Sequence, residues 1–213
     1  MNPIEIFAKS CHELSPSLIE YEVGSEVEFF LFKFLNIVNK LYTSFFVISF
    51  FDAFKAFSKY TTRVFGKPNV LDKCQTIPIF SKESDSLRGS IPIVLAEIKK
   101  NFEKLSNSLV IVLGLDFYSV IFGEEELTKL YPRLINLTYS SNTLIVLNTK
   151  LLSNRAIQIV DGFSATIAKL GVEEKEGKLM RYLVLLRTPF PEYNLRKWYF
   201  SIERGEILFH NSE

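Results

Sequence analysis

The residues with the clearest potential for chemistry surround a glycine turn in the stretch EYEVGSEVE, residues 20–28. The residues before the turn predict a strand, and those after it predict an apolar helix. Such a junction can hold an anion, because backbone N–H groups and the helix N-terminus point at it. Here carboxylates crowd the turn: Glu20, Glu22, Glu26 and Glu28. We expect them to repel phosphate, since a helix dipole offsets only ~0.3–1 kcal/mol at an exposed site.

Two further aspartates follow predicted buried strands. Asp52 comes after the apolar run at residues 44–51, and Asp116 follows the run at residues 109–115. Ligands of open α/β sheets bind outside the carboxyl ends of the strands. The candidate ligand-binding residues at this edge are Glu22, Gly24, Ser25, Glu26, Asp52 and Asp116. Clustered acids can hold Mg²⁺ or another cation, whereas the simpler interpretation is a solvated acidic rim and, for Asp52, a helix N-cap.

Cysteine and histidine form no stronger constellation. The chain contains two of each: Cys11, His12, Cys74 and His210. Only the first two are adjacent, and no C-x-x-C motif occurs, so we expect neither a metal site nor a disulfide. The sequence assigns no catalytic residue.

The elements that must position these residues alternate along most of the chain. Apolar runs predict strands at residues 17–22, 44–51, 73–80, 109–115 and 143–148, and helical spacing predicts helices at residues 25–41, 53–66, 91–105 and 124–139. Four short strands with polar turns follow, at residues 166–170, 180–187, 198–202 and 206–210. This order indicates a single domain over residues 1–213, with three α/β/α layers, a mostly parallel sheet and antiparallel C-terminal strands.

Phenylalanine is unusually common, at 20 of 213 residues. It clusters at residues 29–34, 44–51 and 52–57. Because aromatic side chains bury large areas, these clusters predict a Phe-rich core. The alternative is that some of them cover a partner interface.

The charges of the chain almost cancel, with 25 Lys and Arg against 24 Asp and Glu. Such balance gives no long-range attraction to nucleic acid or to an anionic membrane. The local nucleic-acid candidates are Lys55, Lys59, Arg63 and Lys67, and also Arg187, Arg196 and Lys197. A basic stripe of this kind is usually a solvated face. No apolar run reaches the about 18 residues of a membrane helix, and the N-terminus lacks a basic start, which favours a cytoplasmic protein.

The order of elements resembles the RecA-like ATPase domain, in particular its KaiC/RadA-like branch. Three stretches carry the resemblance: the strand–turn–helix at residues 18–35, sited like a Walker A loop; SLVIVLGLDFYSV at residues 108–120, similar to a Walker B strand; and the closing hairpins at residues 162–210. The chain also resembles a small archaeal family of unknown function with a degenerate version of this fold. The resemblance implies a RecA-like sheet and an ATP site at the glycine turn.

The motifs that serve ATP in that family are altered here. A P-loop, G-x-x-x-x-G-K-[ST], needs Lys for the phosphates and Ser or Thr for Mg²⁺. With Gly24 as its second glycine, Ser25 replaces the Lys and Glu26 replaces the Ser or Thr. Leu113 falls at the Walker B aspartate, and Asp116 comes later. The catalytic glutamate of the family maps near Phe51 and Asp52.

These departures predict a non-catalytic RecA/KaiC-like domain that acts as an interaction or regulatory protein. A protein partner or a homo-oligomer is expected, in keeping with the side-by-side assembly of RecA-like domains. The alternative is a protein that binds a nucleotide, a cation or another small ligand at the degenerate loop. No cofactor is expected, and ATP with Mg²⁺ is disfavoured.

Overall fold

Nine strands form one sheet in the computed structural model, which describes residues 2–66, 69–80, 90–101, 108–175 and 177–210. Their order across the sheet is β3-β2-β4-β5-β1-β6-β7-β8-β9. The strands from β3 to β6 pair in parallel. The last three strands pair antiparallel to their neighbours. The predicted α/β class, with antiparallel strands at the C-terminal edge, is confirmed.

The strand bounds follow the apolar runs of the sequence, with differences at the ends. The strands are β1 Ser17–Tyr21, β2 Phe45–Phe50, β3 Cys74–Ile79, β4 Leu109–Leu113, β5 Asn142–Asn148, β6 Thr166–Lys175, β7 Lys178–Arg187, β8 Arg196–Glu203 and β9 Glu206–His210. The prediction that β4 continues to Leu115 is wrong. Gly114 adopts a φ of +78° and turns the chain into a helix. The β6–β7 hairpin is longer than predicted, because polar residues in an outer hairpin still complete its backbone hydrogen bonds.

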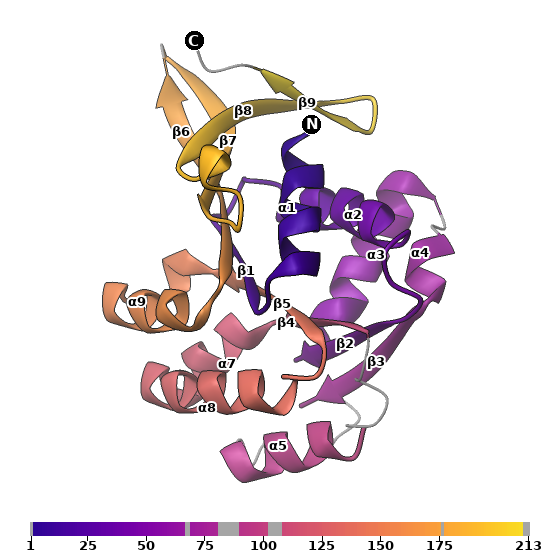
Figure 1. Cartoon of the computed structure of the whole chain (residues 1–213), viewed down its shortest axis with the longest axis vertical. Coiled ribbons are helices and arrows are strands. Elements are labelled where there is room, and N and C mark those ends of the chain that lie inside the picture. Colours follow the sequence, from indigo (N-terminus) through magenta and orange to yellow (C-terminus); the bar gives the residue numbers. More distant parts are fainter. Residues whose placement is uncertain (1, 67–68, 81–89, 102–107, 176, 211–213) are drawn as a thin grey trace.

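Helices cover both faces of the parallel strands (Figure 1). On one face lie α1 Pro3–Glu13, α2 Val27–Val38, α3 Ala53–Phe65 and the short α4 Asn69–Asp72. On the other lie α5 Ile91–Lys99, α7 Leu115–Phe122, α8 Glu124–Leu137 and α9 Asn154–Phe163. The predicted three layers are therefore present. The antiparallel strands continue the sheet past β6, and buried side chains of β7 and β8 pack in the same core as α1 and α2 (Figure 1).

Alternating side chains along each central strand divide the core in two. In β2, Val47 packs with the α1–α2 side and Ile48 with the α7–α8 side. Both are completely buried. Strands buried on both faces need an unbroken apolar run, which is why β2, β4 and β5 were recognisable.

The phenylalanine clusters belong to this core. Buried rings come from α2 and β2: Phe29, Phe30, Phe32, Phe34, Phe45, Phe46 and Phe50. Phe51 and Phe54 are half-buried, and none of the described Phe residues of the three clusters is exposed. The Phe-rich core is confirmed for the described residues of these clusters.

Helices α1, α4, α7 and α9 were not predicted. Helix α1 is set by a capping box, in which the Asn2 side chain accepts from Ile4 N at 2.9 Å and the Glu5 carboxylate accepts from Asn2 N at 3.1 Å. The end of the predicted helix at residues 91–105 lies partly outside the described residues. No helix in the described part of the chain has both the length and the apolarity to cross a bilayer.

Candidate functional site

The connection between β1 and α2 is a tight turn. Ser25 N donates to Glu22 O at 3.1 Å, and Gly24 has a φ of +88°. Glu26 occupies the N-cap position of α2 with a φ of 59° and makes no side-chain capping bond. The Ser25 side chain is fully buried. The junction between β1 and α2 is therefore only the five residues 22–26, whereas a phosphate loop needs a longer run of open backbone N–H groups.

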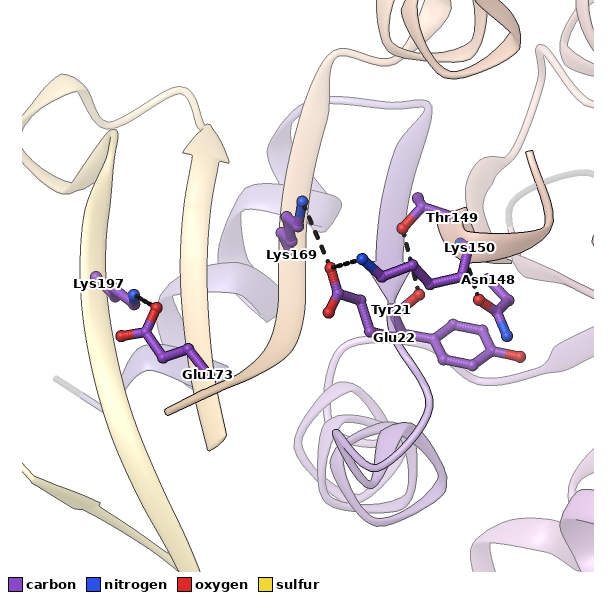
Figure 2. A network of polar contacts seen from close by, with 8 residues as sticks. All are labelled: Tyr21, Glu22, Asn148, Thr149, Lys150, Lys169, Glu173 and Lys197. Atoms are coloured by element: carbon purple, nitrogen blue, oxygen red, sulfur yellow. Dashed lines mark hydrogen bonds and ion pairs between the residues drawn. The ribbon is translucent and has the colours of Figure 1, made fainter. Parts of the chain in front are cut away.

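Glu22, just after β1, lies between two lysines. Its Oε1 is 3.3 Å from Lys150 Nζ and 4.0 Å from Lys169 Nζ. Figure 2 shows the two ammonium groups converging on this carboxylate, one from the 3₁₀ turn Thr149–Leu151 and the other from β6. The nearby Asn148 side chain caps that turn by accepting from Lys150 N at 3.0 Å. The charge of Glu22 is therefore matched by the protein's own cations.

Glu26 is held by Arg181 from β7. Arg181 Nε donates to Gly24 O at 3.0 Å, and its Nη2 lies 3.4 Å from Glu26 Oε1. The hydroxyl of Tyr60 donates to Glu26 Oε2 at 3.2 Å. Burial, with the nearby Glu26 charge, raises the pKa of Tyr60 to about 12, so the hydroxyl stays a donor. The Arg181 guanidinium thus fixes the turn through its contacts with Gly24 O and Glu26.

Asp116 is buried in the first turn of α7, where its carboxylate connects three elements through hydrogen bonds. Its carboxylate accepts from Asn148 N at 3.1 Å, from Phe117 N at 3.1 Å and from Tyr21 OH at 3.4 Å. Burial raises the pKa of Asp116, although these hydrogen bonds act in the opposite direction. The side chain therefore ties the carboxyl ends of β1 and β5 to α7.

Asp52 follows β2 and occupies the N-cap position of α3, as predicted. The predicted capping bond is wrong, because Asp52 has a φ of 60° and its side chain makes no capping hydrogen bond. Ser49 Oγ instead accepts from Phe54 N at 3.0 Å. The strand end supplies the cap, a contact that the sequence pattern did not indicate.

A cavity of about 260 Å³ opens at the carboxyl ends of β1, β4 and β5, between α2, α3 and α7. Its polar and aromatic lining consists of Tyr21, Glu28, Phe57, Tyr60, Asp116 and Phe117. The rest of the wall is Gly114 and aliphatic side chains. Among the six candidate residues, only Asp116 lines it; the others lie at the same sheet edge in separate surroundings.

Glu20 lies inside β1 with its side chain only 3% exposed. Glu20 Oε1 and Asp161 Oδ1 are both buried, and neither has a donor among the described residues. When Glu20 is protonated, its carboxyl group can donate a hydrogen bond to Asp161. Burial first, and then this hydrogen bond and the Asp161 charge, raise the pKa of Glu20 to about 8, while Lys169 acts to lower it.

The expectation that four carboxylates crowd the turn is therefore wrong. Glu20 is buried beside Asp161, Glu22 faces lysines, Glu26 faces Arg181, and Glu28 lines the cavity. Glu20 and Glu22 are two residues apart and lie on the same face of the sheet, near Lys169, whereas Glu26 and Glu28 belong to the start of α2. The sequence analysis missed Asp161 and the basic residues Lys150, Lys169 and Arg181. These residues are far along the chain from the glutamates that they contact, and no local sequence pattern indicates such contacts.

The other candidate groups do not form a site in the described residues. No group of three or more His, Cys, Asp or Glu side chains there is arranged to hold a metal ion. Cys11 is buried and Cys74 is half-buried, and both are free thiols.

Most of the basic candidates have structural contacts or face solvent. Lys55, Lys59 and Arg63 are exposed on α3, and Lys67 lies outside the described residues. Arg187 donates to Ser164 O at 2.6 Å, and Lys197 pairs with Glu173 (Figure 2). Arg196 lies over the Trp198 ring at 5.2 Å.

Comparison with known proteins finds similarity only at the level of structure. No protein-family model matches the chain, and no curated protein sequence matches it. Among solved structures, a KaiC-like protein from the hyperthermophilic archaeon Pyrococcus horikoshii is similar, with a TM-score of 0.65 and 15% sequence identity. The likeness covers 92% of this chain and 89% of that one. At this identity it shows the fold alone, which is RecA/KaiC-like.

Proposed function

We propose that this chain is a RecA/KaiC-like domain that does not hydrolyse ATP and acts as an interaction or regulatory protein. The observation that carries the proposal is the fastening of the β1–α2 turn by Arg181, at Gly24 O and at Glu26. A site for a nucleoside triphosphate needs cations that point at the phosphates and neutralise their charge. In this chain, the cations near the turn instead neutralise Glu22 and Glu26.

The end of β4 also supports the proposal. Leu113 stands where the family has its magnesium-binding aspartate, and Gly114 follows it. Asp116 is nearby, but three hydrogen bonds already orient its carboxylate toward Tyr21, Asn148 and its own helix. These hydrogen bonds suit a carboxylate that holds β1, β5 and α7 together better than one that binds magnesium.

An exposed apolar stripe on α7 supports the interaction role. Phe117, Val120 and Ile121 are 48%, 59% and 54% exposed. Spacing of three and four places them on one helical face. Clustered apolar exposure marks protein contact sites more often than isolated exposure does. We infer that this stripe contacts a second copy of the chain or another protein.

Mg-ATP is expected to leave the melting temperature of the chain unchanged, because carboxylates and their partner cations occupy the turn. Thermal denaturation with Mg-ATP, Mg-GTP and Mg²⁺ alone measures this. Phosphate release by the same preparation, compared with a heat-denatured sample, measures hydrolysis. A rise of several degrees with Mg-ATP, or phosphate release above the denatured control, would contradict the proposal.

Self-association is expected to raise the mean mass with protein concentration in static light scattering. Ile121→Glu places a charge in the α7 stripe and should shift the chain toward monomer. Ile93→Glu is the matched control, since Ile93 is 42% exposed on α5, away from the stripe. A monomer at all concentrations would contradict the proposal that the chain self-associates. Equal effects of Ile121→Glu and Ile93→Glu would contradict the proposal that the α7 stripe forms the interface.

The cavity beside the turn favours a second candidate function, which is the binding of a small ligand at this sheet edge. Cavities at the carboxyl ends of parallel strands are the usual ligand sites of such sheets. The cavity is lined by apolar side chains and by two carboxyl groups, those of Glu28 and Asp116. A ligand here would not require ATP chemistry.

A further inference from the structure

The cavity between α2, α3 and α7 has an unusual mixture of walls. Four aromatic side chains line it: Tyr21, Phe57, Tyr60 and Phe117. Its ionisable carboxyl groups are those of Glu28 and Asp116. No Lys, Arg or His belongs to the lining within the described residues. The wall therefore combines aromatic side chains with carboxyl groups and includes no basic side chain among the described residues.

We propose that this cavity binds a small organic cation, an ammonium compound with an apolar body. The inference rests on the second candidate function, ligand binding at this edge, and is independent of the loss of ATP hydrolysis. Aromatic rings attract an ammonium group through their negative faces, with about 0.5–2 kcal/mol per contact. The Glu28 carboxylate adds a direct charge partner at the α2 wall.

The positive groups nearest the turn do not compete for this role. Arg181 pairs with Glu26 and also contacts Gly24 O. Lys150 and Lys169 pair with Glu22 on the β6 side of β1. Because these cations are matched elsewhere, Glu28 and Asp116 leave the cavity with a negative bias.

Other ligand classes fit less well. Phosphates and carboxylates would face Glu28 and Asp116 without a lining cation. A bare metal ion prefers several oxygen or nitrogen ligands, and no suitable group of side chains exists in the described residues. A neutral apolar compound would give the Glu28 carboxylate no charge partner in a partly dry site.

The volume limits the size of the ligand. The cavity, at about 260 Å³, is slightly below the ~300–1,000 Å³ typical of sites for drug-sized ligands. One aromatic ring or short aliphatic body with a single ammonium group is therefore the expected scale. Long polyamines would extend into solvent.

A matched set of probes tests the proposal: phenethylammonium, its neutral isostere 2-phenylethanol and the anion phenylacetate. Binding is followed by titration with protein-observed NMR. We expect phenethylammonium to bind about tenfold more tightly than 2-phenylethanol, a difference of about 1.4 kcal/mol. Phenylacetate should bind most weakly.

Two variants locate the binding. Glu28→Gln keeps the side-chain size and should bring the affinity for phenethylammonium close to that for 2-phenylethanol. Phe117→Leu removes one aromatic face at a half-exposed position and should weaken the ammonium compound several-fold, so it serves if Glu28→Gln fails to fold. Glu125→Gln, at an exposed carboxylate on α8, is the control and should change nothing.

The outcomes distinguish the claim that the cavity binds a ligand from the claim that the ligand is an organic cation. Equal affinity for the ammonium compound and the alcohol would overturn the cation inference and leave ligand binding intact. Failure of all three probes to bind would overturn both. Tight binding of phenethylammonium that neither Glu28→Gln nor Phe117→Leu weakens would place it outside this cavity and would also overturn the inference. None of these results bears on ATP hydrolysis.

Discussion

Raising the pH from about 5 to about 8 is expected to destabilise the folded chain, because the unfolded chain then releases the Glu20 proton that the buried carboxyl group of the folded chain retains. In the folded state its pKa is raised from 4.5 to about 8. Below pH 4.5 both folded and unfolded chains hold the proton, and no stability is lost. Between the two values only the folded chain retains it, so stability falls as the pH rises.

The groups around Glu20 explain the direction. Asp161 faces it from α9, and Glu22 lies two residues along β1; both negative charges oppose its ionisation. Lys169, directly opposite on β6, favours ionisation. Tyr131 lies nearby on α8, where its hydroxyl shares a 2.9 Å hydrogen bond with Ser164 Oγ. Burial together with Asp161 outweighs the single lysine.

Urea denaturation at pH 5, 6, 7 and 8 measures the effect. We expect the free energy of unfolding to fall by about 1 kcal/mol per pH unit, somewhat under the 1.4 kcal/mol limit for one proton. Glu20→Gln can donate to Asp161 without titrating and should flatten this slope. Glu125→Gln is the control and should keep it. If the free energy of unfolding of Glu20→Gln still falls with pH at the same slope, a group other than Glu20 causes the pH dependence.

Gly114→Ala is expected to destabilise the chain by about 3 kcal/mol, through backbone strain and overpacking. A Cβ at this position would lie 2.6 Å from Phe50 O and 2.9 Å from the Ala53 Cβ. The φ of +78° is also unfavourable for any residue with a side chain. Since Phe50 O belongs to the backbone of β2, it cannot move aside as a flexible side chain does.

Gly162→Ala is the matched control for this substitution. Gly162 lies in α9, and an added Cβ there would meet no heavy atom within 4 Å. Alanine should therefore be neutral or stabilise by up to about 1 kcal/mol. Urea denaturation of both variants gives the comparison. Equal stability of the two would refute the close approach of β2 to Gly114.

The same contact bears on the proposal that the chain lacks a Walker B aspartate. Leu113 stands at the aspartate position, and the next residue has no room for a side chain. Placing an aspartate at position 114 should therefore unfold the chain before it restores a metal ligand. A metal-binding aspartate at this position would need a different backbone at the end of β4.

The sequence by itself determined the central strands and the closing hairpins. The runs FFVISF in β2 and LVIVL in β4 have no polar interruption except Ser49, and such runs bury both faces of a parallel strand. It did not determine where β4 ends, because LVIVLGLDFYSV stays apolar through the turn and into α7. Only the conformation of Gly114 separates strand from helix.

The sequence also determined which residues follow the strands at the carboxyl edge, including Glu22, Glu26 and Asp116. The tertiary structure alone decided their chemistry. Arg181 reaches Glu26 across 155 positions in the chain, because β6 pairs with β1 and β7 pairs with β6. The register between β1 and β6 sets Lys169 opposite Glu20. Strand periodicity is a local property, whereas the charge that neutralises a carboxylate depends on which strands become neighbours.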